Sequence, residues 1–387
     1  MAAEDIGLSS RVRGIEPSGI RRIFELMATM KDPINLSIGQ AHYDPPQELI
    51  DAACDAMREG FNRYTVTQGL PELNDLVLDD VEKRLGTRPE TCLLTSGVSG
   101  GLMLTFLSLL DPGDEILLPD PYFVMYRHLA NLCGAKVKYY NTYPKNDGER
   151  FAIDVEEIDR LVTDKTKIVF VNSPSNPTGG MLTRAEIEGV CKSAERVGAY
   201  VVSDEIYDLF CYEDDYASPL QFTDRVIQLG GFSKTYGVPG WRMGYATGPS
   251  NVLDALKTLQ QFSFVCAPAP FQHALLAAMP TIDLAPYREQ YRQKRDQLVR
   301  DLHPSYKLSK PEGAFYAFPR LPRRKDGTPV ASDEFIEAAV EQKVLIVPGK
   351  AFSEHDTHFR LSFAASDEHL AAGISVLNDL AERFSNS

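Results

Sequence analysis

The sequence is poor in cysteine and in basic residues. Its six cysteines (Cys54, Cys92, Cys133, Cys191, Cys211 and Cys266) are scattered, with no C-x-x-C pair and no His/Cys cluster. This pattern excludes a disulfide framework and a zinc site, and it predicts reduced thiols in a cytoplasmic protein. Lysine and arginine total 40 against 54 aspartates and glutamates, a net charge of −14. Such a charge argues against nucleic acid or an anionic membrane as a partner.

Long apolar segments are also absent. No run approaches the roughly 18 to 20 residues that span a bilayer. The N-terminus carries Glu4, Asp5, Arg11 and Arg13 without an apolar stretch, so we expect no secretory signal and no membrane association. At 387 residues, 43% of them hydrophobic, the chain is long enough for two domains and a large core.

Short apolar runs alternate with amphipathic segments from about residue 90. The runs predicted to be strands are 92–95, 115–118, 167–171, 200–203, 226–229 and 244–247. Between two of them, Thr183 and Glu186 form a capping-box pattern, apolar residues follow from Ile187 at helical spacing, and Gly198 ends the helix. Buried strands joined by helices predict a mostly parallel α/β sheet.

The pattern changes after about residue 280. We predict a long polar helix over 286–302, a glycine-broken strand over 313–318 and a helix from Ser332, followed by strands at 344–347 and 359–363 and a terminal helix. The predicted organisation is a large domain over 46–280 and a small α+β domain over 281–387. The N-terminal segment 1–45 is expected to join the small domain.

Lys234 is the most informative single residue. It ends the apolar run 226–232, and Gly-Val-Pro-Gly-Trp-Arg follows shortly after it. A poorly solvated lysine amine has a lowered pKa and is a nucleophile, and the fork of Arg242 matches a phosphate. Together they predict a Schiff-base lysine beside an anchored phosphate, as pyridoxal phosphate requires. Taken alone, the S-K-x-x-G stretch is more often an ordinary loop.

Three further motifs follow predicted strands. Thr95 to Gly101 is a glycine-rich turn before a helix expected to begin near Leu102, and such a turn binds anions. Its spacing fits neither nucleotide-binding glycine motif. Asn176 lies in a rigid N-P-T-G turn, and Asp204 follows an apolar run, where burial requires a cationic partner such as a protonated pyridine nitrogen. Each motif alone also fits a purely structural role.

The ordered set of motifs resembles a known family. Y-x-x-x-x-G, S-G-x-S, D-P-Y-F, N-P-T-G, S-D-E-I-Y, S-K-x-x-G-x-P-G-W-R-x-G and F-R-L-S-F occur in the order found in class I/II aminotransferases of fold type I. The resemblance extends from about Arg11 to the terminal helix. It implies a large domain with a mostly parallel seven-stranded sheet between helices and a smaller α+β domain. It also implies amino transfer from an L-amino acid to a 2-oxo acid by a ping-pong mechanism with pyridoxal 5'-phosphate.

The resemblance implies roles for the residues of these motifs. Lys234 forms the internal aldimine and then carries the proton, Asp204 pairs with the pyridine N–H, and Asn176 and Tyr207 bond the phenolic oxygen. Phe123 stacks on the ring. The phosphate is held by Gly97, Val98, Ser99, Ser233 and Arg242.

Two implied contacts extend beyond the cofactor. Tyr64 matches a tyrosine that reaches the phosphate from the neighbouring subunit, which makes a homodimer with shared active sites. Arg360 binds the substrate α-carboxylate, with the Gly39 backbone and Asn176 beside it. No metal is implied.

The sequence also departs from the pattern. Gly231 stands where several relatives carry a hydroxyl, Val98 stands where a small residue is frequent, and residues 39–46 differ from the commoner G-E-P-D-F-D-T-P. No second arginine or lysine is assigned to a side-chain carboxylate, so the substrate stays open. Two other functions also stay open. One is a C–S or β-lyase, or an aminocyclopropane-carboxylate-synthase-like enzyme. The other, disfavoured by the charge and by the lack of a DNA-binding module, is a non-catalytic effector-binding protein.

Overall fold

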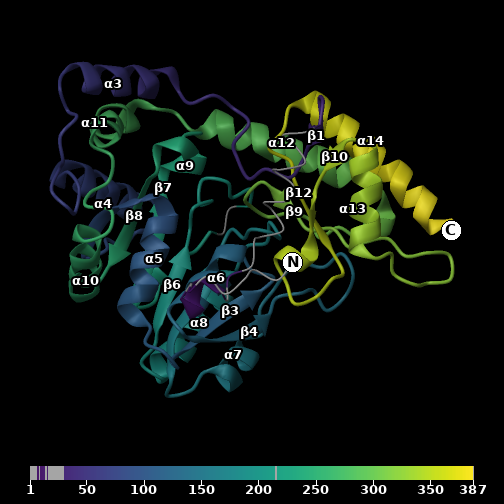
Figure 1. The fold of residues 1–387 in the computed structure, drawn as a ribbon, viewed down its shortest axis with the longest axis horizontal. Helices are drawn as coiled ribbons and strands as arrows, with labels where there is room; N and C mark the ends of the chain where they lie inside the picture. Colours follow the sequence, from purple (N-terminus) through teal and green to yellow (C-terminus); the bar gives the residue numbers. More distant parts are fainter. Residues whose placement is uncertain (1–6, 8, 14, 16–29, 214–215, 387) are drawn as a thin grey trace.

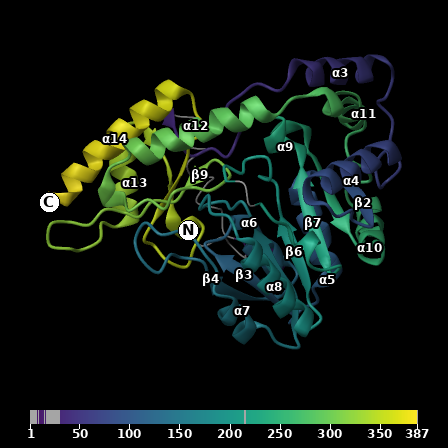
Figure 2. The same cartoon turned by 180° about the vertical axis from the view of Figure 1, so that it is seen from behind.

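A computed structural model describes residues 7, 9–13, 15, 30–213 and 216–386 of the chain. Figure 1 shows a larger body built around one sheet, and beside it a second group of helices, α12, α13 and α14, around short strands. The reverse view in Figure 2 shows the same two groups, with the long helix α12 running from the larger body into the second group. Among the described residues, no helix is both long and apolar enough to cross a membrane.

The central sheet has seven strands. They are β2 (Thr91–Ser96), β3 (Glu115–Asp120), β4 (Lys136–Asn141), β5 (Thr166–Asn172), β6 (Tyr200–Asp204), β7 (Val226–Gly231) and β8 (Met243–Gly248). Their order is β2-β8-β7-β6-β5-β3-β4, and only β8 runs antiparallel to its neighbours. The predicted mostly parallel seven-stranded sheet is confirmed.

Helices cover both faces of this sheet because successive strand residues point to opposite sides. Ile116 and Leu118 pack with the helices on one face, and Leu117 between them packs with those on the other. The helices of this body are α3 (Gln47–Arg58), α4 (Pro71–Leu85), α5 (Gly97–Leu109), α6 (Val124–Leu132), α7 (Val155–Leu161), α8 (Arg184–Arg196), α9 (Phe232–Thr235), α10 (Ser250–Gln261) and α11 (Ala269–Ala278).

Helix α8 illustrates how local sequence sets these bounds. The Thr183 hydroxyl accepts from the backbone N–H of Glu186, and the Glu186 carboxylate accepts from the N–H of Thr183, so the predicted capping box is confirmed. At the other end, Gly198 has a φ of +73°, a left-handed conformation that suits glycine.

The second group of elements combines both ends of the chain. Strand β1 (Ile34–Asn35) pairs in parallel with β10 (Val344–Leu345), and an antiparallel sheet has the order β11-β12-β9. Its remaining elements are β9 (Tyr316–Ala317), β11 (Val347–Pro348), β12 (Phe359–Ser362), α12 (Ala285–Asp301), α13 (Ser332–Glu341) and α14 (Asp367–Ser385). The strand expected over 344–347 is thus two strands in two sheets, because β10 pairs with β1 and β11 pairs with β12.

Short elements complete the described chain. Helix α1 (Ser10–Arg13) lies near the N-terminus, and 3-10 turns occur at Pro219–Gln221, Pro239–Trp241, Met279–Thr281, Pro304–Tyr306 and Gly349–Ala351.

The sheet brings the ends of several strands to one edge. Strands β2, β3, β5, β6 and β7 are mutually parallel, so their carboxyl ends share this edge. Antiparallel β8 begins there, with Met243 opposite Ser96 and Gly244 opposite Gly231. The carboxyl edge of such a sheet is where α/β proteins bind ligands.

Candidate active site

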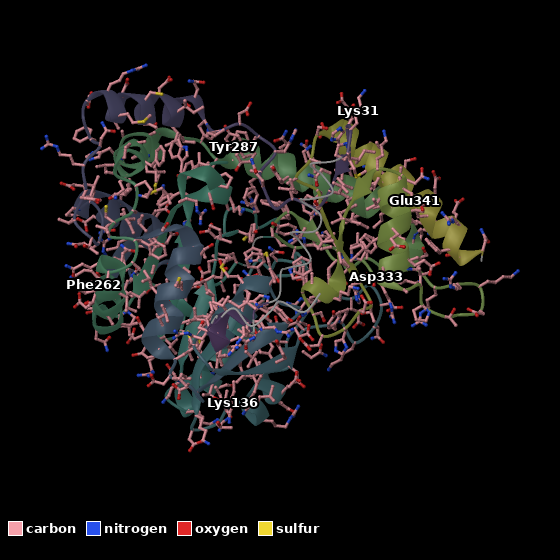
Figure 3. The ribbon with its side chains drawn as sticks, viewed as in Figure 1. Lys31, Lys136, Phe262, Tyr287, Asp333 and Glu341 are labelled. Carbon is pink, nitrogen blue, oxygen red and sulfur yellow. The ribbon has the colours of Figure 1, made fainter. Side chains whose placement is uncertain are left out.

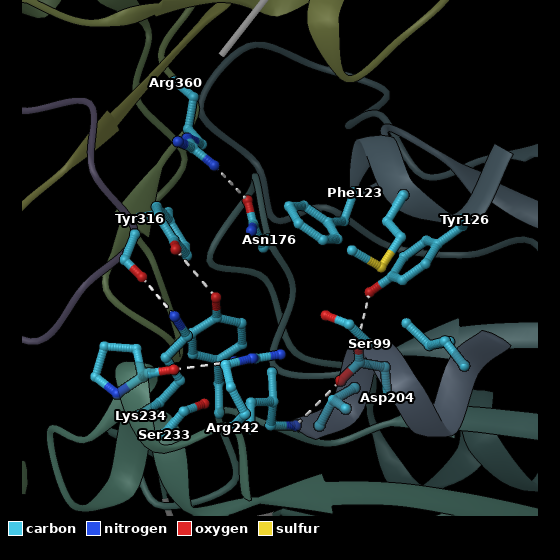
Figure 4. Close-up of a pocket in the computed structure, with 17 residues that line it drawn as sticks. Ser99, Phe123, Tyr126, Asn176, Asp204, Ser233, Lys234, Arg242, Tyr316 and Arg360 are labelled. Carbon is cyan, nitrogen blue, oxygen red and sulfur yellow. Dashed lines mark hydrogen bonds between the residues drawn. The ribbon is translucent and has the colours of Figure 1, made fainter. Parts of the chain in front are cut away.

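A cavity of about 250 Å³ opens at this edge, between the central sheet and the second group of elements. Figure 4 shows the residues around it, with Lys234, Arg242 and Ser233 on one side and Asp204 and Tyr126 across from them. Its lining comprises Gly39, Val98, Ser99, Leu102, Phe123, Met125, Tyr126, Asn176, Asp204, Ile206, Tyr207, Ser233, Lys234, Pro239, Arg242, Tyr316 and Arg360.

Lys234 lies on the short helix α9, directly after β7. Its Nζ donates a hydrogen bond of 2.5 Å to the Gly39 carbonyl. Burial lowers the pKa of Lys234 to about 8, and the charges of Arg242 and Arg360 act in the same direction. The Tyr43 hydroxyl donates to the Lys234 carbonyl at 2.6 Å and so fixes the lysine backbone. Lys234 is therefore a buried amine with an enriched neutral form.

Asp204 ends β6 and is only 3% exposed. Its Oδ2 accepts a hydrogen bond of 2.8 Å from the Tyr126 hydroxyl, and its Oδ1 accepts one of 3.3 Å from the Ile206 N–H. Burial raises the pKa of Asp204 to about 6, although these hydrogen bonds oppose the rise. Among the described residues no ion pair neutralises this carboxylate, so it suits a cationic ligand group.

The turn predicted to bind an anion is the first turn of α5. The helix begins at Gly97 and not near Leu102, so the backbone N–H groups of Val98 and Ser99 belong to its uncapped N-terminus. A Cβ at Gly97 would lie 2.6 Å from the Arg242 guanidinium, and the φ of Gly97 is +67°, so both space and backbone require glycine.

Arg242 completes this anion site from the start of β8. Its NH1 donates to the Pro239 carbonyl at 3.0 Å, and its NH2 donates to the Ser96 carbonyl at 3.5 Å. Its φ of +55° is left-handed, which is unfavourable for a residue with a side chain. The hydroxyls of Ser99 and Ser233 line the same cavity, and together with Arg242 and the start of α5 they are donors of the kind that bind a phosphate.

Arg360 enters the cavity from β12 and is 2% exposed. NH1 donates to Asn176 Oδ1 at 3.0 Å and NH2 donates to the Ser37 carbonyl at 2.6 Å. The guanidinium lies 4.6 Å from the ring centres of both Tyr316 and Phe352. Its Nε has no hydrogen-bond partner among the described residues, so it retains a donor for an anionic ligand.

Most of the predicted site residues share this cavity. All of them line it except Gly97, which lies behind Arg242, and Tyr64, which is 83% exposed. The Tyr207 hydroxyl lies 3.0 Å from the Tyr316 hydroxyl, and the amide oxygen of Asn176 accepts a hydrogen bond from Arg360.

Six lining residues were not predicted as site residues, namely Leu102, Met125, Tyr126, Ile206, Pro239 and Tyr316. The two tyrosines among them make polar contacts with predicted residues. Tyr126 lies three residues after Phe123, the residue that caps the start of α6, and this spacing, which brings the two rings within 5.7 Å of each other, could have signalled it. Tyr316 lies in the strand that was predicted, but nothing in its motif indicates that it faces Arg360.

The residues present fit pyridoxal phosphate. A buried carboxylate, a nucleophilic amine, an uncapped helix start and the Phe123 ring match the pyridine nitrogen, aldehyde, phosphate and ring face of that group. No group of three or more His, Cys, Asp or Glu residues is placed to hold a metal ion in the part of the chain that the structure describes.

Comparison with known proteins decides the family. Residues 31–377 match the family "Aminotransferase class I and II". The chain belongs to this family. It is therefore a pyridoxal-phosphate-dependent aminotransferase, with an amino acid and a 2-oxo acid as small-molecule substrates.

Individual relatives cover nearly the whole aminotransferase chain. A probable aspartate aminotransferase of Methanocaldococcus jannaschii is 36% identical over 97% of this chain and 100% of its own. Solved structures of the aspartate aminotransferase of Thermotoga maritima and the alanine aminotransferase of Pyrococcus furiosus each have a TM-score of 0.89. They are 30% and 32% identical, and each covers 97% of this chain and 100% of its own.

Proposed function

We propose that Lys234 holds the cofactor covalently and that Asp204 pairs with the cofactor's ring nitrogen. The observation that carries this proposal is one cavity in which a buried amine with a lowered pKa accompanies a buried carboxylate without a cationic partner. Bound pyridoxal phosphate supplies an electron-accepting ring that makes the substrate Cα–H acidic. The protein supplies orientation and proton transfer.

The other lining residues divide between three tasks in this proposal. Phe123 covers one face of the ring, and Asn176 and Tyr207 donate to its phenolic oxygen. The phosphate is held by the backbone N–H groups of Val98 and Ser99, with Gly97 leading into this turn, by the hydroxyls of Ser99 and Ser233, and by Arg242. These groups are fixed by strand ends and helix starts before the ligand arrives, so little ordering cost remains on binding.

Proton transfer falls to Lys234. Once the substrate amine has taken its place on the cofactor, Nζ is a free amine whose lowered pKa favours the neutral form. A neutral amine in this position would accept the proton from the substrate Cα and return it to carbon C4′ of the cofactor, so the amine is neutral again when the transfer is complete. The Gly39 carbonyl accepts a hydrogen bond from Nζ at 2.5 Å. This contact restrains the position of the amine before the proton is transferred.

The proposed function is tested with amino donors and 2-oxo acids. Incubation of the holoenzyme with an L-amino acid and 2-oxoglutarate or pyruvate should yield the new amino acid and the new 2-oxo acid in equal amounts. A panel of aspartate, alanine and aromatic donors would identify the preferred one. Ammonia release in place of a new amino acid would instead identify a lyase.

Arg360 is proposed to anchor the substrate α-carboxylate with Gly39 and Asn176 beside it. Lysine lacks the planar fork, so Arg360→Lys should lose the alignment of the Cα–H bond. We expect kcat/KM to fall at least about a hundredfold, about 2.7 kcal/mol, for every amino donor. Steady-state kinetics with the same panel checks this, and the cofactor absorbance should stay unchanged. A loss confined to acidic donors would show that Arg360 binds the side chain instead.

We also propose a homodimer in which Tyr64 completes the partner's phosphate site. Tyr64 and Phe262 are 83% and 82% exposed, which is unusual for large hydrophobic residues. Figure 3 shows Phe262 at the outer edge of the larger body. Further exposed apolar residues follow or precede these two in the chain or lie on helix α5, namely Met57, Phe61, Val66, Met103, Leu107, Phe264 and Val265. The Gln260 side chain donates to the Thr67 carbonyl at 2.7 Å and so joins two of these segments.

Mixed dimers test the sharing of active sites. Tyr64→Ala and Lys234→Ala should each be nearly inactive, but their heterodimer contains one site with both residues intact. Statistical mixing should therefore restore about a quarter of wild-type activity. The activity of mixed and unmixed samples is measured after subunit exchange has been verified by mass. Exchange without recovered activity would place Tyr64 outside the partner's site.

Two broader proposals accompany the site. The chain is divided into the N-terminal segment 1–45, the large domain 46–280 and the small domain 281–387, with β1 carrying the first segment into the sheets of the last. The location is the cytoplasm, a proposal supported by scattered free cysteines.

A further inference from the structure

Glu205 is a second buried carboxylate directly after Asp204. It is 1% exposed, and its N–H continues the β6–β7 ladder by donating to the Leu229 carbonyl at 2.9 Å. Side chains of adjacent extended residues point to opposite faces, so Glu205 lies on the far side of the strand from Asp204. The residue does not line the active-site cavity.

Four neutral donors surround the Glu205 carboxylate. The hydroxyls of Ser203 and Ser218 donate to Oε1, each at 2.7 Å. The Tyr216 hydroxyl and the Gln228 amide donate to Oε2, at 2.5 Å and 2.6 Å. Each oxygen thus accepts two short hydrogen bonds, which fills the lone pairs of an ionised carboxylate.

One of these four donors, the Gln228 amide, is held in its orientation by a further hydrogen bond. The Thr247 hydroxyl on β8 donates to Gln228 Oε1 at 2.9 Å, which turns the Gln228 NH2 group toward Glu205. No ion pair to Glu205 occurs among the described residues, so no nearby cation cancels its charge. Burial raises the pKa of Glu205, but all four donors oppose that rise. The arrangement therefore holds an anion in the core without a counter-ion.

This anion is close enough to act on Asp204. The two residues are adjacent in the chain, and the Glu205 charge adds to the burial that raises the pKa of Asp204. Interactions between charges are strong in a buried setting because little water screens them. A negative charge on the side of β6 away from the cavity therefore favours the protonated form of Asp204 and of any group that Asp204 contacts in the cavity.

We propose that Glu205 is a positioning residue that acts through Asp204, as a buried negative charge that strengthens proton binding at the cofactor. The inference rests on the proposed role of Asp204 at the ring nitrogen. Loss of the Glu205 charge would weaken the protonated form of the cofactor, and the electron-accepting power of its ring would fall with it.

Glu205→Gln tests this, because it keeps the side-chain size and removes the charge. The visible absorption of the bound cofactor is titrated with pH in the holoenzyme. The charge favours the protonated cofactor, so its removal should lower the midpoint by about half to one pH unit. We expect kcat to fall about tenfold with KM changed less than about threefold, because Arg360 still binds the substrate carboxylate.

Two further variants separate charge from packing. Tyr216→Phe removes one donor, so it should shift the midpoint in the same direction but by less. Thr247→Val is the matched control, since it loosens the network without touching the carboxylate, and its midpoint should equal that of the wild type. If Glu205→Gln does not fold, the contrast between Tyr216→Phe and Thr247→Val carries the test.

The outcomes are distinct. An unshifted midpoint in Glu205→Gln, or equal shifts in Tyr216→Phe and Thr247→Val, would overturn the inference. Failure of the proposed function would appear elsewhere, as an Asp204→Asn variant with normal turnover. An inactive Asp204→Asn together with an unshifted Glu205→Gln would remove only the role of Glu205.

Discussion

Replacing Lys234 with alanine should lower the turnover of amino transfer by about five powers of ten, equivalent to about 7 kcal/mol. If Lys234 has the proposed role, the variant loses both the covalent attachment of the cofactor and the amine that moves the substrate proton. It should still fold, because the side chain is a desolvated amine whose one hydrogen-bond partner within the described part of the chain is the Gly39 carbonyl. Stopped-flow and steady-state assays with a saturating amino donor measure the loss.

The covalent role has a direct readout. Borohydride reduction of the wild-type holoenzyme followed by peptide mapping should locate the pyridoxyl group on Lys234. Lys257→Ala, which changes an exposed lysine of α10, is the matched control and should be labelled at Lys234 as in the wild type. A label on another lysine, or full turnover of Lys234→Ala, would end the assignment.

The lowered pKa gives this lysine a pH signature. A pKa of about 8 in place of 10.5 leaves about three hundredfold more neutral amine at pH 7. Only the neutral amine attacks an aldehyde, so the rate of covalent cofactor uptake by the cofactor-free enzyme should rise with pH and level off above about pH 8.

Asp204→Asn should lower turnover by about four powers of ten, about 5 kcal/mol. Asparagine is isosteric and can still accept from the Tyr126 hydroxyl, so the fold should survive. It carries no charge, however, and therefore cannot keep a ring nitrogen protonated. The loss should appear in kcat for every amino donor, since the ring accepts electrons in each reaction.

Tyr126→Phe is the control for this variant. It removes the hydrogen bond to Asp204 and leaves the carboxylate charge, so it should reduce turnover only about tenfold. Turnover of Asp204→Asn within about threefold of the wild type would show that Asp204 is not the partner of the ring.

The sequence predicts six of the seven strands of the sheet and misses the edge strand β4. Strands β5 and β6 are continuous apolar runs because both of their faces are covered. Strand β4 (Lys136–Asn141) has one buried residue and alternates Lys136 and Lys138 with apolar residues, so it shows no continuous apolar run. The other edge strand, β2, has four consecutive buried residues and is predicted. The register between β4 and β3 depends on contacts between the two strands, and local sequence patterns do not reveal such contacts.

The same contrast holds in the candidate site. Lys234, Asp204 and Asn176 each follow a predicted strand, so their convergence at one sheet edge follows from topology. Tyr126 and Tyr316 contact Asp204 and Tyr207 across 78 and 109 residues of chain, and only tertiary packing brings them there. The start of α5 was placed too late because glycines argue against a helix, whereas Gly100 and Gly101 admit the side chains of Ser96 and Leu229.

At Arg242 the left-handed backbone conformation lowers the stability of the fold, whereas the side chain is proposed to bind the cofactor phosphate. This conformation costs a residue with a side chain about 1 kcal/mol, and asparagine tolerates it better than arginine does. Selection for heat resistance alone would therefore exchange Arg242 early. On the proposed role of Arg242, the product would be a more robust protein without its phosphate anchor, so thermostable variants of this enzyme have to be sought with cofactor retention as a second criterion.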